Sequence, residues 1–248
     1  MNQPSEVASW LEDHLQSLEL SEEAEGYLYG RGAREESIAS LGIKEWRPAT
    51  TTSPSPHFRA RYQDRGQRLD GYLVVPLRGP TGRLVGIEAR SRFEKKITEF
   101  RLPEASWNPV LLNAPETAQK LWNGGSVWVV EGLFDLLALM WVVPSTDAVL
   151  ATLKAGLAKN HVEFLARFCT NTVYMVYDND KAGRNATNGY VDHATNQRHL
   201  GALELLTRAG LKAVDYRYGG KDPGEVWSSG GYRKLQQMFQ PFGDSTRP

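Results

Sequence analysis

Short apolar segments alternate with amphipathic ones from Gly125 to the C-terminal region, and this pattern restricts the fold more than any other feature of the chain. The pattern predicts strands and helices in alternation, at 126–130, 133–142, 148–150, 157–168, 172–177, 182–208, 212–218 and 225–239. Strands joined by helices form right-handed crossovers. We therefore expect an α/β fold with a mainly parallel sheet that is covered by helices on both faces.

Acidic residues directly follow three of these predicted strands. They are Glu131 and Asp135 after the first strand, Asp178 and Asp180 after the third, and Asp222 after the last. Ligands of open α/β sheets bind outside the carboxyl ends of the strands, so we expect the five carboxylates to share one site. Because like charges repel, a divalent cation is expected among them, and carboxylate oxygens suit Mg²⁺ or Mn²⁺. The arrangement predicts phosphoryl-transfer chemistry.

Each acidic segment also has an ordinary structural interpretation. Glu131 and Asp222 could simply mark the starts of helices, where negative charge is favourable. An EF-hand beginning at Asp178 is excluded, because Ala182 cannot serve as a ligand and Gly189 stands where a bidentate Glu is required. The metal interpretation depends on three such segments occurring in one βα array.

The region before Gly125 has a different character. It predicts helices at 5–18, 21–29, 34–41 and 115–122, a Pro-rich linker at 48–56, and strands at 72–77, 84–89 and 97–102. We expect three parts: an N-terminal mixed α+β lobe over residues 1–125, an α/β domain over 126–218, and a C-terminal helical segment over 219–248 that carries Asp222.

Charge is distributed unevenly, although the 248-residue chain has 29 basic and 29 acidic residues and therefore no net charge. Basic residues gather in the N-terminal lobe, at Arg59, Arg61, Arg65, Arg68, Arg78, Arg83, Arg90, Arg92, Lys95, Lys96 and Arg101. This stretch is either a nucleic-acid contact or a solvated basic face.

Several classes of protein are excluded. No apolar run reaches the roughly 18 residues that span a bilayer, and the first residues do not resemble a secretory signal, so we expect a cytoplasmic protein without membrane contact. The one cysteine, Cys169, lies in an apolar pattern typical of a core, and a zinc site would need more Cys and His ligands. We place His193 and His199 in a polar helix and do not expect them to bind metal.

The acidic segments resemble motifs of the Toprim superfamily. Residues 130–139 and 177–186 are similar to its Glu-Gly-x-x-Asp and Asp-x-Asp motifs, and 220–225 resembles a third motif of DnaG-type primases. Upstream, 27–32 resembles the opening helices of the primase catalytic core and 74–90 its basic hairpin. The resemblance covers roughly residues 20–235, and it implies a basic lobe followed by a Rossmann-like Toprim domain.

The resemblance implies a metal-dependent nucleotidyltransferase that makes short ribonucleotide primers on single-stranded DNA from nucleoside triphosphates. It assigns Glu131, Asp135, Asp178 and Asp180 to catalysis. Mg²⁺ or Mn²⁺ would be held by Glu131, Asp178, Asp180 and Asp222. The expected nucleic-acid or nucleotide contacts are Arg31, Arg83, Arg90, Lys154, Lys181 and Arg184.

The chain also departs from the DnaG pattern. Residues 99–102 replace a Lys-Tyr pair that the family carries after the hairpin, and Lys154 is a candidate substitute for the missing lysine. We find neither the zinc-binding nor the helicase-binding module, so a replicative helicase or a separate zinc-containing template-recognition protein is an expected partner. Two alternatives stay open: a Toprim nuclease and a non-catalytic nucleic-acid-binding adaptor.

Overall fold

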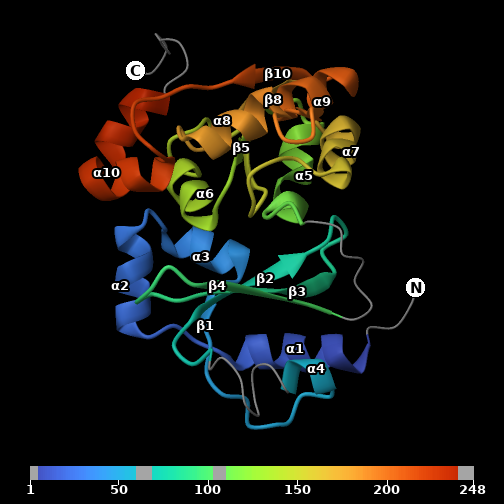
Figure 1. The fold of residues 1–248 in the computed structure, drawn as a ribbon. Coiled ribbons are helices and arrows are strands. Elements are labelled where there is room, and N and C mark those ends of the chain that lie inside the picture. The colour runs from blue at the N-terminus through green and yellow to red at the C-terminus, as the bar shows by residue number, and fades with distance from the viewer. Residues whose placement is uncertain (1–4, 60–68, 103–109, 240–248) are drawn as a thin grey trace. The chain divides into compact units, whose positions relative to one another are not determined.

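The computed structural model describes residues 5–59, 69–102 and 110–239. By its internal contacts the chain divides into two compact units (Figure 1). The first comprises residues 1–29 and 34–108, and the second comprises 30–33 and 109–248. Arg61, Arg65 and Arg68 of the basic stretch lie outside the described residues.

The first unit is built on an antiparallel sheet of four strands in the order β1-β2-β3-β4. The strands are β1 (Lys44–Glu45), β2 (Leu73–Arg78), β3 (Leu84–Arg90) and β4 (Ile97–Arg101). Its helices are α1 (Glu6–Ser17), α2 (Glu22–Gly30), α3 (Glu35–Leu41) and the single turn α4 (Pro56–Phe58).

Helix α1 shows how local sequence fixes this unit. The Oγ atom of Ser5 accepts a hydrogen bond from the backbone N–H of Ala8 at 3.1 Å, which caps the helix. Leu11 and Leu15, four residues apart, lie on one face of the helix and are buried. They join a core cluster with Phe58 and with side chains of β2, β3 and β4, so α1 and α4 cover one face of the sheet (Figure 1).

The second unit contains a four-stranded parallel sheet in the order β10-β7-β5-β6. Its strands are β5 (Val127–Val130), β6 (Ala148–Ala151), β7 (Thr172–Met175) and β10 (Lys212–Asp215). Its helices are α5 (Ala114–Trp122), α6 (Leu133–Leu139), α7 (Lys159–Phe168), α8 (Lys181–Asn188), α9 (Ala202–Arg208) and α10 (Pro223–Phe239).

Alternation along β5 divides the core of the second unit into two layers. Val127 and Val129 join a cluster with α5, α7 and α9 on one face of the sheet. Trp128 points to the other face, where it stacks on Tyr174 at 4.3 Å between ring centroids and meets Phe239 of α10 at 6.2 Å. All of β5 is buried, as expected for a strand covered on both faces.

One predicted element is wrong. The expected helix at 182–208 is instead α8, a hairpin of β8 (Gly189–Asp192) and β9 (Gln197–Leu200), and then α9. Gly189 has a φ of 81°, a left-handed conformation that ends α8, and the chain leaves the hairpin at Gly201. His193 and His199 therefore lie on this hairpin and its turn, outside any helix.

The other predicted elements occur in the structure, with small changes at their ends. The mixed α/β architecture, an antiparallel sheet followed by a parallel one, is confirmed. The helix expected at 133–142 ends as α6 at Leu139, and α10 contains a non-helical Gly231. Within the described ranges, no helix has both the length and the apolar composition needed to cross a membrane.

The aromatic layer beneath α10 provides a test of the fold. Phe239 is fully buried against Trp128 and Tyr216, so Phe239→Ala should lower the free energy of unfolding by about 3–5 kcal/mol. Phe93→Ala is the matched control: Phe93 is 82% exposed, and its loss should change stability by less than about 0.5 kcal/mol. Urea denaturation followed by circular dichroism measures both. Equal effects would contradict this packing.

Candidate active site

The candidate site lies where the order of the parallel strands reverses. β5 and β7 are adjacent, and the chain runs from β5 to β6 on one side and from β7 to β10 on the other, so the connections after these two strands leave in opposite directions. Such a switch point opens a crevice at the carboxyl ends of the two strands. Glu131 immediately follows β5, and Asp178 lies three residues beyond the end of β7. The sheet topology therefore places these two carboxylates beside each other.

Glu131 and Asp178 are directly linked. Glu131 Oε1 accepts a hydrogen bond from the backbone N–H of Asp178 at 3.2 Å. Burial and, next, the carboxylate of Asp178 raise the pKa of Glu131 to about 7, with further contributions from Asp180 and Asp222. Burial and the charges of Asp222 and Asp180 raise the pKa of Asp178 to about 6, although Lys221 opposes this shift. Four carboxylates thus share one electrostatic environment.

Asp180 and Asp222 each cap a helix at this site. Asp180 Oδ1 accepts a hydrogen bond from the backbone N–H of Gly183 at 2.9 Å, which starts α8. Asp222 Oδ1 accepts one from the N–H of Glu225 at 2.7 Å, in the first turn of α10. Each cap uses one of the two carboxylate oxygens, and Asp222 Oδ2 lies 3.7 Å from Lys221 Nζ.

Asp135 has a different environment. Its side chain is buried, Oδ2 accepts a hydrogen bond from the N–H of Gly132 at 3.2 Å, and Oδ1 accepts one from the N–H of Gly224 at 3.0 Å. The carboxylate therefore joins the start of α6 to the start of α10. By holding the first turn of α10, Asp135 also fixes the segment that carries Asp222.

Asn179, which the sequence analysis did not single out, ties two loops of the site together. Its Nδ2 donates hydrogen bonds to the carbonyls of Tyr218 and Gly220, both at 2.8 Å, and its backbone N–H donates to the carbonyl of Lys221 at 2.7 Å. Because Asn179 stands between Asp178 and Asp180, these bonds connect the loop after β7 to the loop before α10. Its place between two predicted ligands was the available signal in the sequence.

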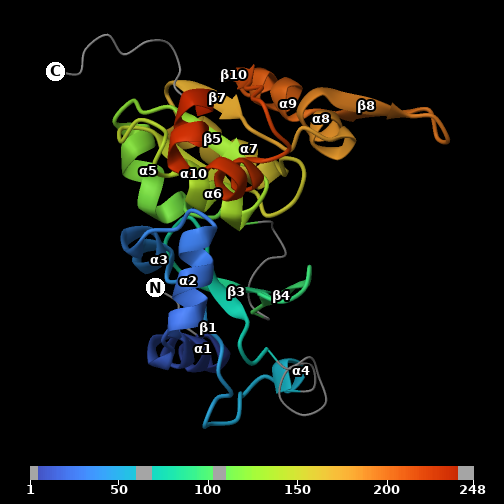
Figure 2. The same cartoon turned by 90° about the vertical axis from the view of Figure 1, so that its left-hand side faces the viewer.

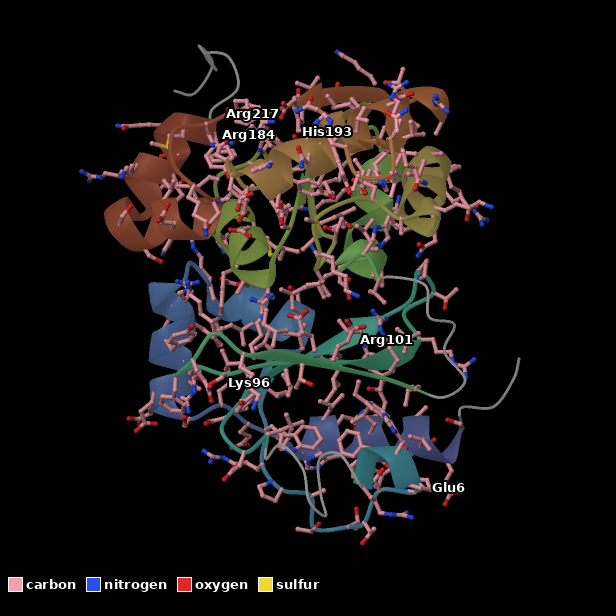
Figure 3. All side chains as sticks on the ribbon, viewed as in Figure 1. Glu6, Lys96, Arg101, Arg184, His193 and Arg217 are labelled. Carbon is pink, nitrogen blue, oxygen red and sulfur yellow. The ribbon has the colours of Figure 1, made fainter. Side chains whose placement is uncertain are left out.

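Two arginines add to this connection. Arg184 Nη1 donates to the carbonyl oxygen of Asn179 at 2.7 Å, and Arg217 Nη1 donates to Asn179 Oδ1 at 3.2 Å. Figure 3 shows Arg184 and Arg217 close together on the second unit. The contacts with Asn179 bring positive charge next to the acidic loop.

Tyr218 is a second residue that the sequence analysis missed. Its hydroxyl donates to the carbonyl of Lys221 at 3.2 Å. Burial, and then the surrounding carboxylates, starting with Asp135 and Asp178, raise the pKa of Tyr218 well above its ordinary value. The phenol therefore stays protonated and remains a hydrogen-bond donor. No pattern in the sequence marked this tyrosine.

Four of the predicted cationic contacts belong to the same unit as the carboxylates. The guanidinium carbon of Arg31 lies 4.3 Å above the ring centroid of Phe134, beside Asp135 in sequence. Within the described residues, the buried Nε of Arg31 has no hydrogen-bond partner. Lys154 is exposed in the loop after β6, and Lys181 and Arg184 are exposed in the first turns of α8.

The remaining two predicted cations belong to the first unit. Arg83 is exposed in the turn between β2 and β3, and Arg90 forms an ion pair with Glu88 at 2.5 Å. Other arginines of the basic stretch are likewise paired with carboxylates of this unit, at Arg78–Glu12, Arg92–Glu45 and Arg101–Glu99. The basic character of this stretch is therefore partly neutralised within the unit.

The donor set suits a hard divalent cation. Its candidate ligands are carboxylate oxygens, and burial together with neighbouring carboxylates raises the pKa values of Glu131 and Asp178. Among the residues the structure describes, no three His, Cys, Asp or Glu side chains are gathered closely enough to form a metal cluster. Mg²⁺ does not require such a cage, because it keeps several waters and commonly uses one or two carboxylates with substrate phosphates.

Comparison with protein families and curated proteins agrees with this site. Residues 128–225 match a family model described as Toprim-like. The chain is 29% identical over 179 residues to the DNA primase of Aquifex aeolicus, covering 69% of this chain and 32% of that protein. It is 25% identical over 254 residues to the DNA primase of Thermotoga maritima, covering 92% of this chain and 41% of that protein. The chain thus spans about a third to two fifths of these relatives.

Solved structures show the same fold. The zinc-binding and RNA polymerase domains of the Aquifex aeolicus primase match with a TM-score of 0.70 and 23% identity, over 94% of this chain and 60% of that one. A DnaG primase catalytic domain bound to single-stranded DNA matches with a TM-score of 0.69 and 20% identity, over 94% and 78%.

Together, the strand order, the acidic loops and the family match define a Toprim domain in the second unit. The whole chain has the fold of a DnaG-type primase catalytic core, and its sequence is similar to those of bacterial DNA primases.

The pKa of Glu131 predicts how stability depends on pH without metal. The pKa of Glu131 in the folded chain is about 7, above its ordinary value of 4.5. The contribution of Glu131 to the stability of the fold is therefore complete below about pH 4.5, and it is lost as the pH rises through about 7. In the presence of a chelator, the melting temperature should fall as the pH rises from about 4.5 to about 7, and it should fall less in Glu131→Gln. Thermal melts measure this fall. Addition of Mg²⁺ at about pH 8 should raise the melting temperature of the parent chain more than that of Glu131→Gln. Identical pH profiles would contradict the shared electrostatic environment.

The contacts of Asn179 predict the effect of removing its side chain. Asn179→Ala loses three side-chain hydrogen bonds, so the free energy of unfolding should fall by about 1–3 kcal/mol and the affinity for Mn²⁺ should weaken. Asn188→Ala is the matched control, because the exposed Asn188 makes one hydrogen bond to Arg184. Urea denaturation and Mn²⁺ titration by electron paramagnetic resonance measure the two effects. Unchanged Mn²⁺ affinity in Asn179→Ala would show that the two loops do not position the ligands.

Proposed function

We propose that this chain is the catalytic core of a DNA primase, a metal-dependent nucleotidyltransferase that joins nucleotides into short primers on single-stranded DNA. The observation that carries the proposal is the electrostatic coupling of carboxylates from three loops at the switch point of the parallel sheet. Burial of several like charges costs free energy, and a bound cation with a phosphate substrate would offset that cost.

Glu131, Asp178, Asp180 and Asp222 are the residues that would hold Mg²⁺ or Mn²⁺. A bound ion of this kind lowers the pKa of an attacking oxygen and neutralises charge that develops on the phosphate. Asp135 acts as a positioning residue, because both of its oxygens accept hydrogen bonds from backbone N–H groups of α6 and α10. This role differs from the direct catalytic contact that the resemblance implied.

The reaction would proceed by in-line displacement. The 3′ oxygen of one nucleotide bonds to the α-phosphorus of an incoming nucleoside triphosphate, the bond to the β-phosphate bridging oxygen breaks, and pyrophosphate leaves. The proton of the 3′ hydroxyl passes to solvent. Such chemistry requires mainly alignment and charge stabilisation, which fixed carboxylate-bearing loops are suited to supply.

Arg31 is the best-supported phosphate contact in the Toprim unit. Its guanidinium is held over the face of Phe134, and its buried Nε lacks a hydrogen-bond partner among the described residues. A phosphate oxygen would satisfy that donor, since the guanidinium fork matches phosphate geometry. Lys154, Lys181 and Arg184 are further candidates on this unit, and Arg83 and Arg90 are candidates for template contact on the first.

The similar proteins support the choice of substrate class. The curated relatives are DNA primases, and one structure with the same fold is a DnaG primase catalytic domain bound to single-stranded DNA. Because the chain spans only 32% and 41% of those relatives, primer synthesis by this chain is our inference from the site and the fold together.

Primer synthesis tests the proposal. Purified chain with Mg²⁺ or Mn²⁺, single-stranded DNA and labelled nucleoside triphosphates should yield short labelled strands on a denaturing gel. Asp178→Ala should reduce the yield at least about 100-fold, because a lost metal ligand removes several kcal/mol of transition-state stabilisation. Asp13→Ala, in the exposed face of α1, is the control and should retain the parent activity.

Other outcomes would redirect the assignment. Shortened template without incorporation, abolished by Asp178→Ala, would identify a metal-dependent nuclease. Binding of single-stranded DNA with neither product, unaffected by Asp178→Ala, would identify a non-catalytic adaptor. Either result would overturn the proposal.

A further inference from the structure

The hairpin between α8 and α9 is separate from both larger sheets. β8 and β9 pair only with each other among the described strands, from Gly189↔Leu200 to Asp192↔Gln197. Figure 2 shows the hairpin extending away from the helices of the second unit. It therefore adds little to the core of that unit.

The hairpin is nevertheless a built structure. At its base the two strands are in close contact, and a Cβ atom on Gly201 would lie 2.2 Å from the backbone nitrogen of Gly189. At its tip, Asp192 Oδ1 accepts a hydrogen bond from the N–H of Ala194 at 2.8 Å, and Asn196 adopts a left-handed φ of 54°. Two-stranded hairpins are at best marginally stable alone, so a well-formed hairpin that projects from its unit and adds little to the core is a candidate for a role in binding.

One face of the hairpin carries a pair of flat rings. Tyr190 and His199 are directly opposite in the strand register, and their rings stack at 4.6 Å between centroids and 11° between planes. Tyr190 is 44% exposed. Val191, which is 45% exposed, belongs to the opposite face, because side chains alternate along a strand. An exposed stacked pair of this kind can accept the face of a nucleic-acid base.

The charge around the hairpin is positive. Arg198 of β9 and Arg208 of α9 are two cations that contact a single carboxylate. Glu204 is shared between Arg198 at 2.7 Å and Arg208 at 2.6 Å. This local excess is complementary to a phosphate backbone.

We propose that the β8–β9 hairpin is a docking surface for single-stranded nucleic acid, with an unpaired base stacked on the Tyr190–His199 pair and phosphates near Arg198 and the cations of α8. A single strand fits better than a duplex, because the bases of a duplex are already stacked on one another. The inference rests on the proposed function and extends it, since α8 connects the hairpin directly to Asp180 of the acidic site.

Fluorescence anisotropy with fluorescein-labelled oligothymidylates of about 4 to 20 nucleotides tests the docking surface. The double variant Tyr190→Ala/His199→Ala should raise the dissociation constant about 10-fold, because the variant loses the rings on which a base would stack. Tyr190→Phe keeps the ring and should bind like the parent. Val191→Ala, with similar exposure on the opposite face, is the matched control and should also bind like the parent.

Cross-linking gives a readout that does not depend on the stability of a variant. Ultraviolet irradiation of the parent chain with the same oligothymidylate should produce cross-links within residues 189–200, located by mass spectrometry. Cross-links found only elsewhere, or equal affinity of the double variant and the parent, would overturn the docking surface and favour a protein partner for the hairpin.

The proposed function and the docking surface can fail separately. Primer synthesis by the parent, with an unchanged affinity in the double variant, would overturn the docking surface alone. A parent chain that neither binds the oligothymidylate nor makes primers would overturn both.

Discussion

The repulsion among carboxylates at the carboxyl edge of the parallel sheet is the constraint on which the rest of the site depends. Glu131 and Asp178 are half-buried, and their pKa values are raised to about 7 and about 6 because like charges and burial act together. A fold that maintains such a cluster must hold it by other interactions. The backbone around these side chains supplies them.

Hydrogen bonds from neighbouring loops hold the acidic segments in place. Asp135 bridges α6 and α10, and Asn179 joins the loop after β7 to the loop before α10. Gly183 allows the first turn of α8 to pack directly against the backbone of Asp178, since a Cβ at Gly183 would lie 2.1 Å from the carbonyl oxygen of Asp178. The site is thus held mainly by backbone groups. Each helix cap uses only one carboxylate oxygen of Asp180 or Asp222, so the second oxygen of each side chain can bind a ligand.

Much of the fold could be predicted from sequence because its signals are local. Apolar runs that alternate with amphipathic segments predicted the parallel sheet, and acidic residues at strand ends predicted the candidate site. The prediction of a helix at 182–208 failed because a polar segment has little hydrophobic periodicity. Two glycines in this segment, Gly189 and Gly201, mark the ends of the hairpin. Asn179 was missed because its partners are backbone carbonyls about 40 residues away in sequence. Tyr218 was missed because the carboxylates around it belong to other loops.

The sequence by itself determined which residues are available for chemistry: the carboxylates, the strands that precede them and the resemblance to a primase core. Periodicity and spacing report on neighbours along the chain, so they determined the elements and their order. Only the tertiary structure decided that β5 and β7 are adjacent, that Asp135 is occupied by backbone N–H groups, and that Arg31 lies over Phe134. These facts depend on contacts between distant segments, and such contacts exist only once the sheet has formed.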